Sequence, residues 1–284
     1  MLLNDRFAKR LFLVPSLLVG SLSLFIVAFL LMESWSTLAS VGAQQLLSDS
    51  TWNPYSGEYF MLPMVVTTLA LGAGALVLAV VVGVPLAIFV CYYAPRPLQR
   101  LTRGLLELLA GIPSVIIGLW GLVTLVPIIN EWSAPGTTLL AGIVVLAIMI
   151  LPTVTILSEQ GFQQIPDDYA KAGLAMGLEK RTIVFNIMLP IAGPSIASAS
   201  LLGLARAIGE TMAVLMVTGN AINFPESLTT SVRALTSNIA LEMPYAMDEH
   251  RGMMFISGFI LIVIVFILVV CNQVLSWSPR HVRK

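Results

Sequence analysis

The sequence predicts an all-α integral membrane protein with six membrane-spanning helices. The prediction rests on composition, on the lengths of the apolar runs and on the distribution of charge. Hydrophobic residues make up 57% of the 284 residues and charged residues only 11%, whereas a soluble domain carries about 25% charged residues. The mean hydropathy of +0.92 is too high for a globule that faces water on all sides.

The apolar runs are long enough to cross a membrane. Uncharged stretches cover residues 11–32, 61–95, 132–158, 182–205 and 252–279. A hydrocarbon core of ~30 Å is crossed by ~20 helical residues, and helices are expected because lipid offers the backbone no hydrogen-bond partners. We predict membrane helices at residues 11–32, 62–92, 104–129, 138–158, 191–217 and 253–276.

The first run follows basic residues and therefore resembles a secretory signal, with Val41, Gly42 and Ala43 as a cleavage site. Its 22 residues (11–32) exceed the apolar region of a signal peptide, which has about 7–15 residues. We therefore predict a retained first span.

The third and fourth predicted helices contain prolines, and the third also carries a charged residue near its start. Pro113, Pro127 and Pro152 lie within them, and we expect these prolines to kink the helices. Glu107 stands near the start of the third helix, where we expect an interfacial carboxylate close to Arg103, with a gate contact as the alternative.

The basic residues predict the orientation. Four segments hold three Lys or Arg each, 12 of the 15 in the chain. They are Arg6, Lys9 and Arg10; Arg96, Arg100 and Arg103; Lys171, Lys180 and Arg181; and Arg280, Arg283 and Lys284. Because basic loops stay in the cytoplasm, both termini are predicted to be cytoplasmic. We expect residues 1–60 to form the first span and an external segment. Residues 61–284 would form a core of five spans with a cytoplasmic loop at 159–190.

The sequence lacks the motifs of several functional classes. No G-x-x-x-x-G-K-[ST] loop occurs, so the chain is not expected to bind ATP itself. Cys91 and Cys271 lie in apolar runs and are interpreted as small hydrophobic residues. With no spaced nucleophile and base and no zinc motif, we expect neither an enzyme nor a metal site, and no nucleic-acid partner.

The loop between the fourth and fifth spans predicts a short helix, a glycine and a second amphipathic stretch. Asp167 and Asp168 follow Pro166, which favours a helix start, and Gly177 suits a helix end. This segment lies outside the membrane, where small and apolar side chains can fill a groove on another protein.

The same loop resembles the EAA loop of ABC importer permeases. In that family a Glu-Ala-Ala triplet precedes a glycine, and Ile-x-Leu-Pro follows after nine residues; here Gly177 is followed after nine residues by Ile187, Leu189 and Pro190. The triplet itself departs from the family, reading Lys171, Ala172 and Gly173. The resemblance implies that this loop docks on an ATPase. The expected coupling residues are Tyr169, Ala170, Lys171, Ala172, Gly173, Gly177, Ile187, Leu189 and Pro190. The alternative is an ordinary amphipathic helix at the membrane surface.

The fifth predicted span carries two charges. Arg206 and Glu210 are four residues apart, which places them on one helix face where each can neutralise the other. A charge in the membrane costs ~2.5–3.5 kcal/mol and usually faces an interior or a water path. One interpretation is a structural ion pair. The other is an anion pathway, since a guanidinium matches tetrahedral oxyanions. Ser195, Ala199, Gly203 and Ala207 form a small-residue stripe that allows close helix packing.

The segment from Arg206 through Glu210, Thr211 and Met212 to Val214 resembles the R-A-[IL]-G-E-T-M-A-V segment of PstC-type permeases of phosphate ABC importers. Residues 107–121 resemble the E-L-L-A-x-I-P-S segment of that family, and the similarity covers most of residues 61–275. The resemblance implies a type I ABC importer permease fold in a bacterial or archaeal inner membrane. It assigns Arg206, Glu210 and Thr211 to the substrate pathway. The implied partners are a second permease of PstA type, two ATPase subunits that bind ATP and Mg, and an extracytoplasmic phosphate-binding protein.

Three alternatives remain open from the sequence. The same architecture can serve another tetrahedral anion such as sulfate or molybdate. A passive channel or secondary carrier would need no ATPase-docking loop. A signalling subunit that senses phosphate supply would need no transport at all.

Overall fold

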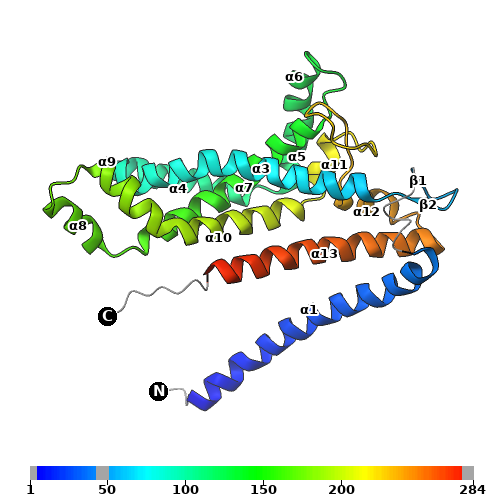
Figure 1. The fold of residues 1–284 in the computed structure, drawn as a ribbon, viewed down its shortest axis with the longest axis horizontal. Coiled ribbons are helices and arrows are strands. Elements are labelled where there is room, and N and C mark those ends of the chain that lie inside the picture. Colours follow the sequence, from blue (N-terminus) through cyan, green and yellow to red (C-terminus); the bar gives the residue numbers. More distant parts are fainter. Residues whose placement is uncertain (1–4, 43–50, 277–284) are drawn as a thin grey trace.

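The computed structural model describes residues 5–42 and 51–276, and most of them are helical (Figure 1). The long helices are α1 (Asp5–Val41), α3 (Leu62–Ile88), α4 (Arg96–Gly111), α7 (Leu139–Gln163), α10 (Leu189–Ile208) and α13 (Asp248–Ser276). The short ones are α5 (Ser114–Trp120), α6 (Val126–Asn130), α8 (Asp167–Ala175), α9 (Lys180–Ile183), α11 (Met212–Val217) and α12 (Leu235–Glu242). There are three π-helical turns in the described chain: η1 (Phe89–Tyr93) extends α3, η2 (Gly121–Leu125) joins α5 to α6, and η3 (Val184–Met188) joins α9 to α10.

Five helices of the described chain are long and apolar enough to cross a membrane. They are Leu11–Ala39, Leu62–Tyr93, Leu139–Gln163, Lys180–Ile208 and Asp248–Val274. A sixth candidate is the bent pair Arg96–Gly111 and Ser114–Asn130, counted as one span. The predicted all-α fold with up to six spans is confirmed.

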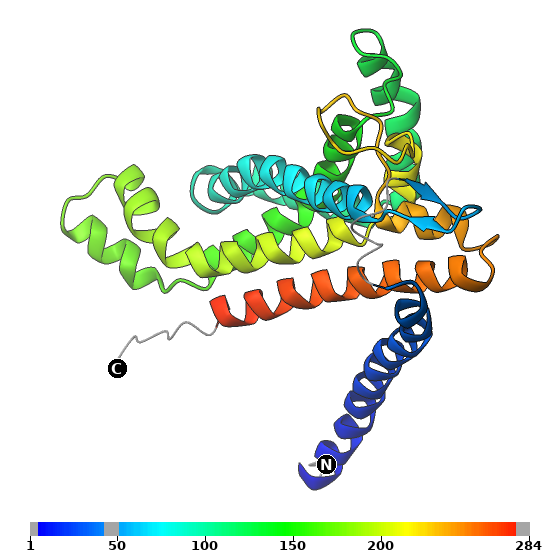
Figure 2. The same ribbon diagram turned by 45° about the vertical axis from the view of Figure 1, so that its right-hand side comes forward.

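The third span is broken rather than kinked. Its two halves meet at an angle of 95°, at Ile112 and Pro113. Pro113 has no N–H to continue the helix, and the residue before a proline is pushed out of the helical region; Ile112 accordingly has φ −69° and ψ 127°. In Figures 1 and 2, α4 runs alongside α3, whereas α5 and α6 turn away from the bundle.

The fifth span differs from the prediction at both ends. It begins at Lys180, where α9 and η3 continue into α10, and α10 ends at Ile208. Residues 209–211 are not helical, and α11 begins separately at Met212. The expected continuous helix over residues 191–217 is therefore wrong.

Helix α7 forms the centre of the bundle between α3 and α10. Two glycines allow it to approach α3 closely: a Cβ on Gly142 would lie 2.6 Å from Leu71 Cδ2, and one on Gly74 would lie 2.6 Å from Ile143 Cδ1. Ile150 and Val154 of α7 are fully buried in the same core. Helix α7 contacts α3, α4, α10 and α11, so it connects the elements around the candidate site.

The bundle has two ends, which we name by the short helices there. The α8 end holds α8 and α9. The α12 end holds α12 and a two-residue hairpin, β1 (Trp52–Asn53) paired antiparallel with β2 (Glu58–Tyr59), which the sequence did not predict. Helix α1 packs against α13, and in Figure 1 both run from the α12 end toward the α8 end.

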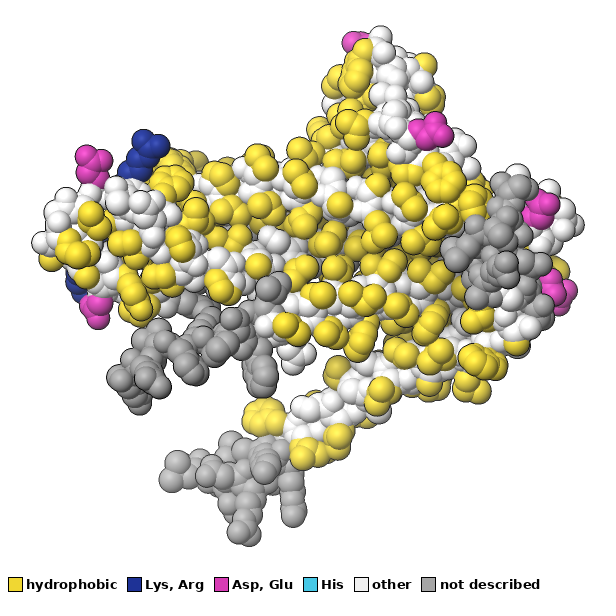
Figure 3. Space-filling model, viewed as in Figure 1, with side chains coloured by type: hydrophobic (Ala, Val, Ile, Leu, Met, Phe, Trp, Pro, Cys, Tyr) yellow, Lys and Arg dark blue, Asp and Glu magenta, His cyan; other side chains and the backbone are white. Residues whose placement is uncertain are grey.

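The charged side chains concentrate away from the middle of the bundle. On the face seen in Figure 3, Lys and Arg side chains lie at the α8 end, Asp and Glu side chains lie at both ends and on the α6 projection, and a broad apolar surface lies between them. An uncharged belt of this kind is what a lipid-facing surface requires. The side chains of Arg6, Lys9 and Arg10, and all of Arg280, Arg283 and Lys284, lie outside the described residues.

Candidate functional site

Arg206 lies in the last turn of α10, directly before the break at residues 209–211. Its side chain is exposed in the isolated chain, and its Nη1 lies 3.4 Å from the hydroxyl of Thr153 on α7. Leu202 on the same helix is 45% exposed and Met212, just after the break, is 44% exposed. One face of this segment is therefore left uncovered by the rest of the chain.

Glu210 does not pair with Arg206 as predicted. It stands in the break, and its Oε1 accepts a hydrogen bond of 3.2 Å from the Ala213 amide at the start of α11. The Thr236 hydroxyl donates to the Glu210 carbonyl oxygen at 2.8 Å. Within the described chain no ion pair forms between the two charges. The carboxylate instead satisfies a free amide at a helix N-terminus, where negative charge is favourable.

Thr211 lies at the start of α11, and its hydroxyl is 3.5 Å from the Gly209 carbonyl oxygen. The break thus places Arg206, Glu210 and Thr211 in one short segment. Their side chains contact different groups: Arg206 contacts Thr153, Glu210 contacts an amide of α11, and Thr211 contacts the local backbone. A role of this segment in substrate passage is a proposal that we argue below.

The small-residue stripe of α10 lies against α7. Ala199 and Ala207 are 1% and 3% exposed. A Cβ on Gly203 would lie 2.9 Å from Val154 Cγ2, and a Cβ on Gly161 of α7 would lie 2.5 Å from Ser195 Cβ. Because Gly203 and Gly161 have no side chains, the two helices come close together. This contact holds α10, which carries Arg206, against the central helix α7.

The predicted docking loop forms a helix, a left-handed glycine and a second helix. Helix α8 begins after Pro166 with Asp167 and Asp168 in its first turn. Gly177 has φ +76°, a conformation that L side chains rarely adopt. Its N–H donates to the Leu174 carbonyl, and that of Leu178 to Gly173, which satisfies the last carbonyls of α8.

The outer surface of α8 is open and carries large apolar side chains beside the charged Asp167, Asp168 and Lys171. Leu174 is 62% exposed and Met176 is 69% exposed, with Tyr169 at 37%. Ala170 is half-buried and Ala172 exposed. Lys171, which stands where the family has Glu, lies 3.8 Å from the Asp168 carboxylate on the surface. This end of the molecule therefore presents two large apolar side chains to whatever lies beyond it.

The inner surface of α8 packs against α9 and η3. Gly173 is buried, and a Cβ there would lie 2.8 Å from Ile183 Cγ1 and 3.6 Å from Ile187 Cδ1. Leu189 is half-buried, whereas Pro190 is exposed at the start of α10. The glycine at the third position of the triplet thus lets α8 lie closer to α9 than alanine would.

Arg103 makes an ion pair that the sequence did not reveal. Its partner is Glu159 of α7, not Glu107. Arg103 Nε donates to Glu159 Oε1 at 2.6 Å, and Gln163 Nε2 donates to the same oxygen at 2.8 Å. The two partners are 56 residues apart in the sequence, so no local spacing could have indicated the pair.

At the α12 end, Glu242 joins four segments. Its carboxylate accepts hydrogen bonds from Trp52 Nε1 at 2.8 Å and Arg233 Nη1 at 2.6 Å, and lies 2.9 Å from His250 Nε2. Arg233 also donates to the Asn220 carbonyl. Nearby, burial and then the charge of Glu249 raise the pKa of Tyr59. These contacts tie the hairpin, the loop before α12 and the start of α13 together.

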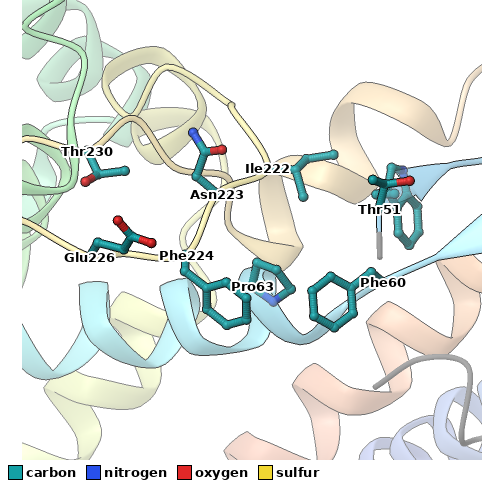
Figure 4. A pocket seen from close by; sticks show the side chains of 9 residues that line it. Thr51, Phe60, Pro63, Ile222, Asn223, Phe224, Glu226 and Thr230 are labelled. Atoms are coloured by element: carbon teal, nitrogen blue, oxygen red, sulfur yellow. The ribbon is translucent and has the colours of Figure 1, made fainter. Parts of the chain in front are cut away.

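A cleft of roughly 600 Å³ opens beside this network. Phe60, Pro63 and Phe224 lie next to one another along one side of it, and Asn223 of the loop before α12 lies across from them (Figure 4). The rings of Phe60 and Phe224 lie edge to face, 5.8 Å apart. Over the described residues, no group of three His, Cys, Asp or Glu side chains is placed to hold a metal ion.

Comparison with known proteins identifies the architecture. The family described as "Binding-protein-dependent transport system inner membrane component" matches residues 79–281. The chain belongs to this family of permeases. The permease is 32% identical over 281 residues to the phosphate transport system permease protein PstC of Xylella fastidiosa (strain 9a5c), with 88% of this chain and 86% of that relative covered. It is 34% identical over 244 residues to a Bacillus subtilis (strain 168) protein named "Probable ABC transporter permease protein YqgH", with 84% of this chain and 79% of that relative covered.

A solved structure shares the fold of the permease. An inward-facing form of the MetNI methionine ABC transporter contains a chain that aligns with a TM-score of 0.64 at 20% identity, covering 81% of this permease and all (100%) of that chain. The fold is therefore that of a type I ABC importer permease, and the chain is a multi-pass component of an inner membrane. Membership of this family implies ATPase and substrate-binding-protein partners in general.

Proposed function

We propose that this permease forms half of the anion pathway of an ATP-driven phosphate importer. The second half would come from a PstA-type permease. Two ATPase subunits would bind ATP and Mg, and an extracytoplasmic protein would deliver phosphate. Relatives named as phosphate transport permeases support the substrate class, and the exposed guanidinium of Arg206 supports the route.

The observation that carries the proposal is that Arg206, beside the break, makes no ion pair within the described part of the chain. Glu210 is engaged with the α11 amide, and Thr153 is a neutral neighbour at 3.4 Å. A full positive charge in lipid would cost ~2.5–3.5 kcal/mol, so the exposed face of α10 is expected to meet water or a partner subunit. A guanidinium offers a planar fork of donors that fits a phosphate better than a point charge does.

The proposed docking surface on α8 would couple the Arg206 segment to ATP hydrolysis in the ATPase subunits. ATP binding closes the ATPase dimer and moves α8, and the spans then open Arg206 toward the outside. Phosphate enters from the binding protein, and hydrolysis restores the inward-facing state. Both termini would lie in the cytoplasm with α8, in agreement with the basic residues around that loop. The chain itself supplies pathway and coupling, with no bond-making chemistry of its own.

The test is uptake by the assembled complex in vesicles. Arg206→Gln keeps some hydrogen-bonding capacity but removes the charge, and we expect phosphate uptake to fall by about 10–100-fold, since charge-assisted hydrogen bonds of this kind contribute about 1.5–3 kcal/mol. Uptake by Arg206→Lys should lie between that of the unaltered complex and that of Arg206→Gln, because lysine keeps the charge but lacks the planar fork of donors. Arg100→Gln, an exposed arginine on α4, is the matched control. Full uptake by normally assembled Arg206→Gln would refute the proposed route.

Anion competition in the same assay separates the rival substrates. Excess sulfate or molybdate should leave phosphate uptake unchanged. If either blocks uptake and is itself accumulated in an ATP-dependent manner, the permease serves another tetrahedral anion.

A further inference from the structure

The ion pair between Arg103 and Glu159 joins α4 to the last turns of α7. Glu159 is 4% exposed, and one of its carboxylate oxygens receives Arg103 Nε at 2.6 Å and Gln163 Nε2 at 2.8 Å. The Nη2 of Arg103 contacts the same oxygen. The Arg103 side chain is 41% exposed, so one partner reaches into the bundle from its surface.

The pair sits where the docking loop begins. Glu159 lies one turn before the end of α7 at Gln163, and α8 follows only a few residues later. Phe162, in the same last turn, packs edge to face on Tyr92 at 5.7 Å and shares a buried cluster with Val184 and Ala192. The end of α7 is thus held to η1, η3, α10 and, through the ion pair, α4.

Helix α4 leads from this point toward the break that follows Arg206. It continues through Ile112 and Pro113 into α5, which packs on α11. A Cβ on Gly118 of α5 would lie 2.7 Å from Ala213 Cα, so the two short helices are in close contact. Helix α8 follows α7 along the chain, α7 packs on α4, α4 leads into α5, and α5 packs on α11. Elements joined by packing or by the chain itself therefore run from α8 to α11, and energetic coupling between distant sites travels through connections of this kind.

Stability alone does not require this pair. A buried ion pair pays a desolvation cost, and well-packed apolar residues of similar volume often stabilise a fold equally well. What an ion pair with directed hydrogen bonds adds is one fixed alignment of two helices. Arg96 and Arg100, also on α4, are exposed and make no ion pair within the described chain, which leaves Arg103 as the basic side chain of α4 that reaches α7.

We propose that Arg103 and Glu159 are positioning residues for coupling. They fasten α4 to α7, so that movement of α8 reaches α5, α11 and the Arg206 segment without either residue touching the substrate. This inference rests on the proposed function, because it needs an ATPase that moves α8.

The test measures phosphate transported per ATP hydrolysed by the reconstituted complex. Arg103→Gln and Glu159→Gln should each hydrolyse ATP at the wild-type rate and lower this ratio by about fivefold or more, the range of typical coupling between sites. The double variant should be no worse than either single, because both changes remove one interaction. Arg103→Lys should recover part of the ratio. Arg100→Gln, the matched control on the same helix, should leave it unchanged.

An apolar replacement guards against variants that fail to fold. Arg103→Met combined with Glu159→Leu removes the buried charge together with its partner, and we expect it to assemble normally with a lowered ratio. A wild-type ratio in this double variant, or in both glutamine variants, would overturn the coupling role alone. Absence of ATP-driven uptake by the unaltered complex would overturn the proposed function, and the coupling role with it.

Discussion

The end of α10, directly before Gly209, determines whether Arg206 forms an ion pair with Glu210. In a continuous helix, Arg206 and Glu210 would lie one turn apart and neutralise each other. The helix instead ends at Ile208. Glu210 turns to the Ala213 amide, while Thr236 from α12 holds its carbonyl oxygen. Over the described residues the Arg206 guanidinium is therefore left without an ion pair, as the proposed anion pathway requires.

Glu210 variants test its role as a helix cap. Glu210→Ala removes the acceptor for the Ala213 amide and should destabilise the permease by about 1 kcal/mol, the usual cost of losing a cap. Glu210→Gln keeps an oxygen in the same place and should lose only a few tenths of that. The measurement is the thermal midpoint of the purified complex. Equal midpoints for the alanine variant and the unaltered complex would exclude the cap.

Individual helices are held together by glycines at which a side chain would not fit. At the junction of α1 and α13, a Cβ on Gly252 would overlap the Thr37 side chain. At the α8 end, Gly173 allows α8 to lie on Ile183. In both places the missing Cβ sets the distance between two elements, so helix packing depends on single positions.

The α1–α13 junction offers a matched pair of substitutions. Gly252→Ala should push α1 away from α13 and destabilise the permease by about 1–3 kcal/mol, the usual cost of overpacking. Gly258→Ala lies on the same helix, where a Cβ would meet Leu30 Cδ2 at an ordinary 3.8 Å, and should be tolerated. Thermal midpoints of the two variants check the difference. Equal midpoints would show that α1 is not packed on α13 as described.

The docking loop offers a second pair. Gly173→Ala restores the alanine of the family triplet, yet its Cβ would press on Ile183 and shift α8 from α9. We expect a loss of about 1–3 kcal/mol and weaker retention of the ATPase subunit on purification. Gly193→Ala, at a half-buried helical position with no neighbour within 4 Å, is the control. If Gly173→Ala retains the ATPase as well as the control does, the close packing of α8 does not matter for docking.

The whole molecule is a bundle with the proposed docking helix α8 at one end and a polar network at the other. Between them, α7 touches the elements that carry the ion pair, the small-residue stripe and Arg206. The Glu242 network fixes the α12 end through Trp52, Arg233 and His250, while the α8 end offers exposed Leu174 and Met176. This asymmetry agrees with the proposed function, in which the partner ATPases move the molecule from its α8 end.

The sequence predicts the spans better than it predicts their breaks. Long apolar runs locate α1, α3, α7 and α13 because hydrophobic length is a local property. The end of α10 depends on the Thr236 hydroxyl and on an amide that Glu210 reaches only after the chain has turned. The partner of Arg103 comes from another helix, so neither could be read from spacing. Pro113 predicts a kink, but the 95° bend depends on the packing of α5 against α11.

ATP-driven uptake by the assembled complex tests the proposed function most directly. The permease, its second permease, the ATPase and the binding protein would be reconstituted in vesicles, with radiolabelled phosphate on the binding-protein side. We predict accumulation against the gradient with ATP and Mg on the ATPase side, and none when a non-hydrolysable analogue replaces ATP. Phosphate uptake at the same rate without ATP would mean a channel or secondary carrier, and the proposal of an ATP-driven importer would be wrong.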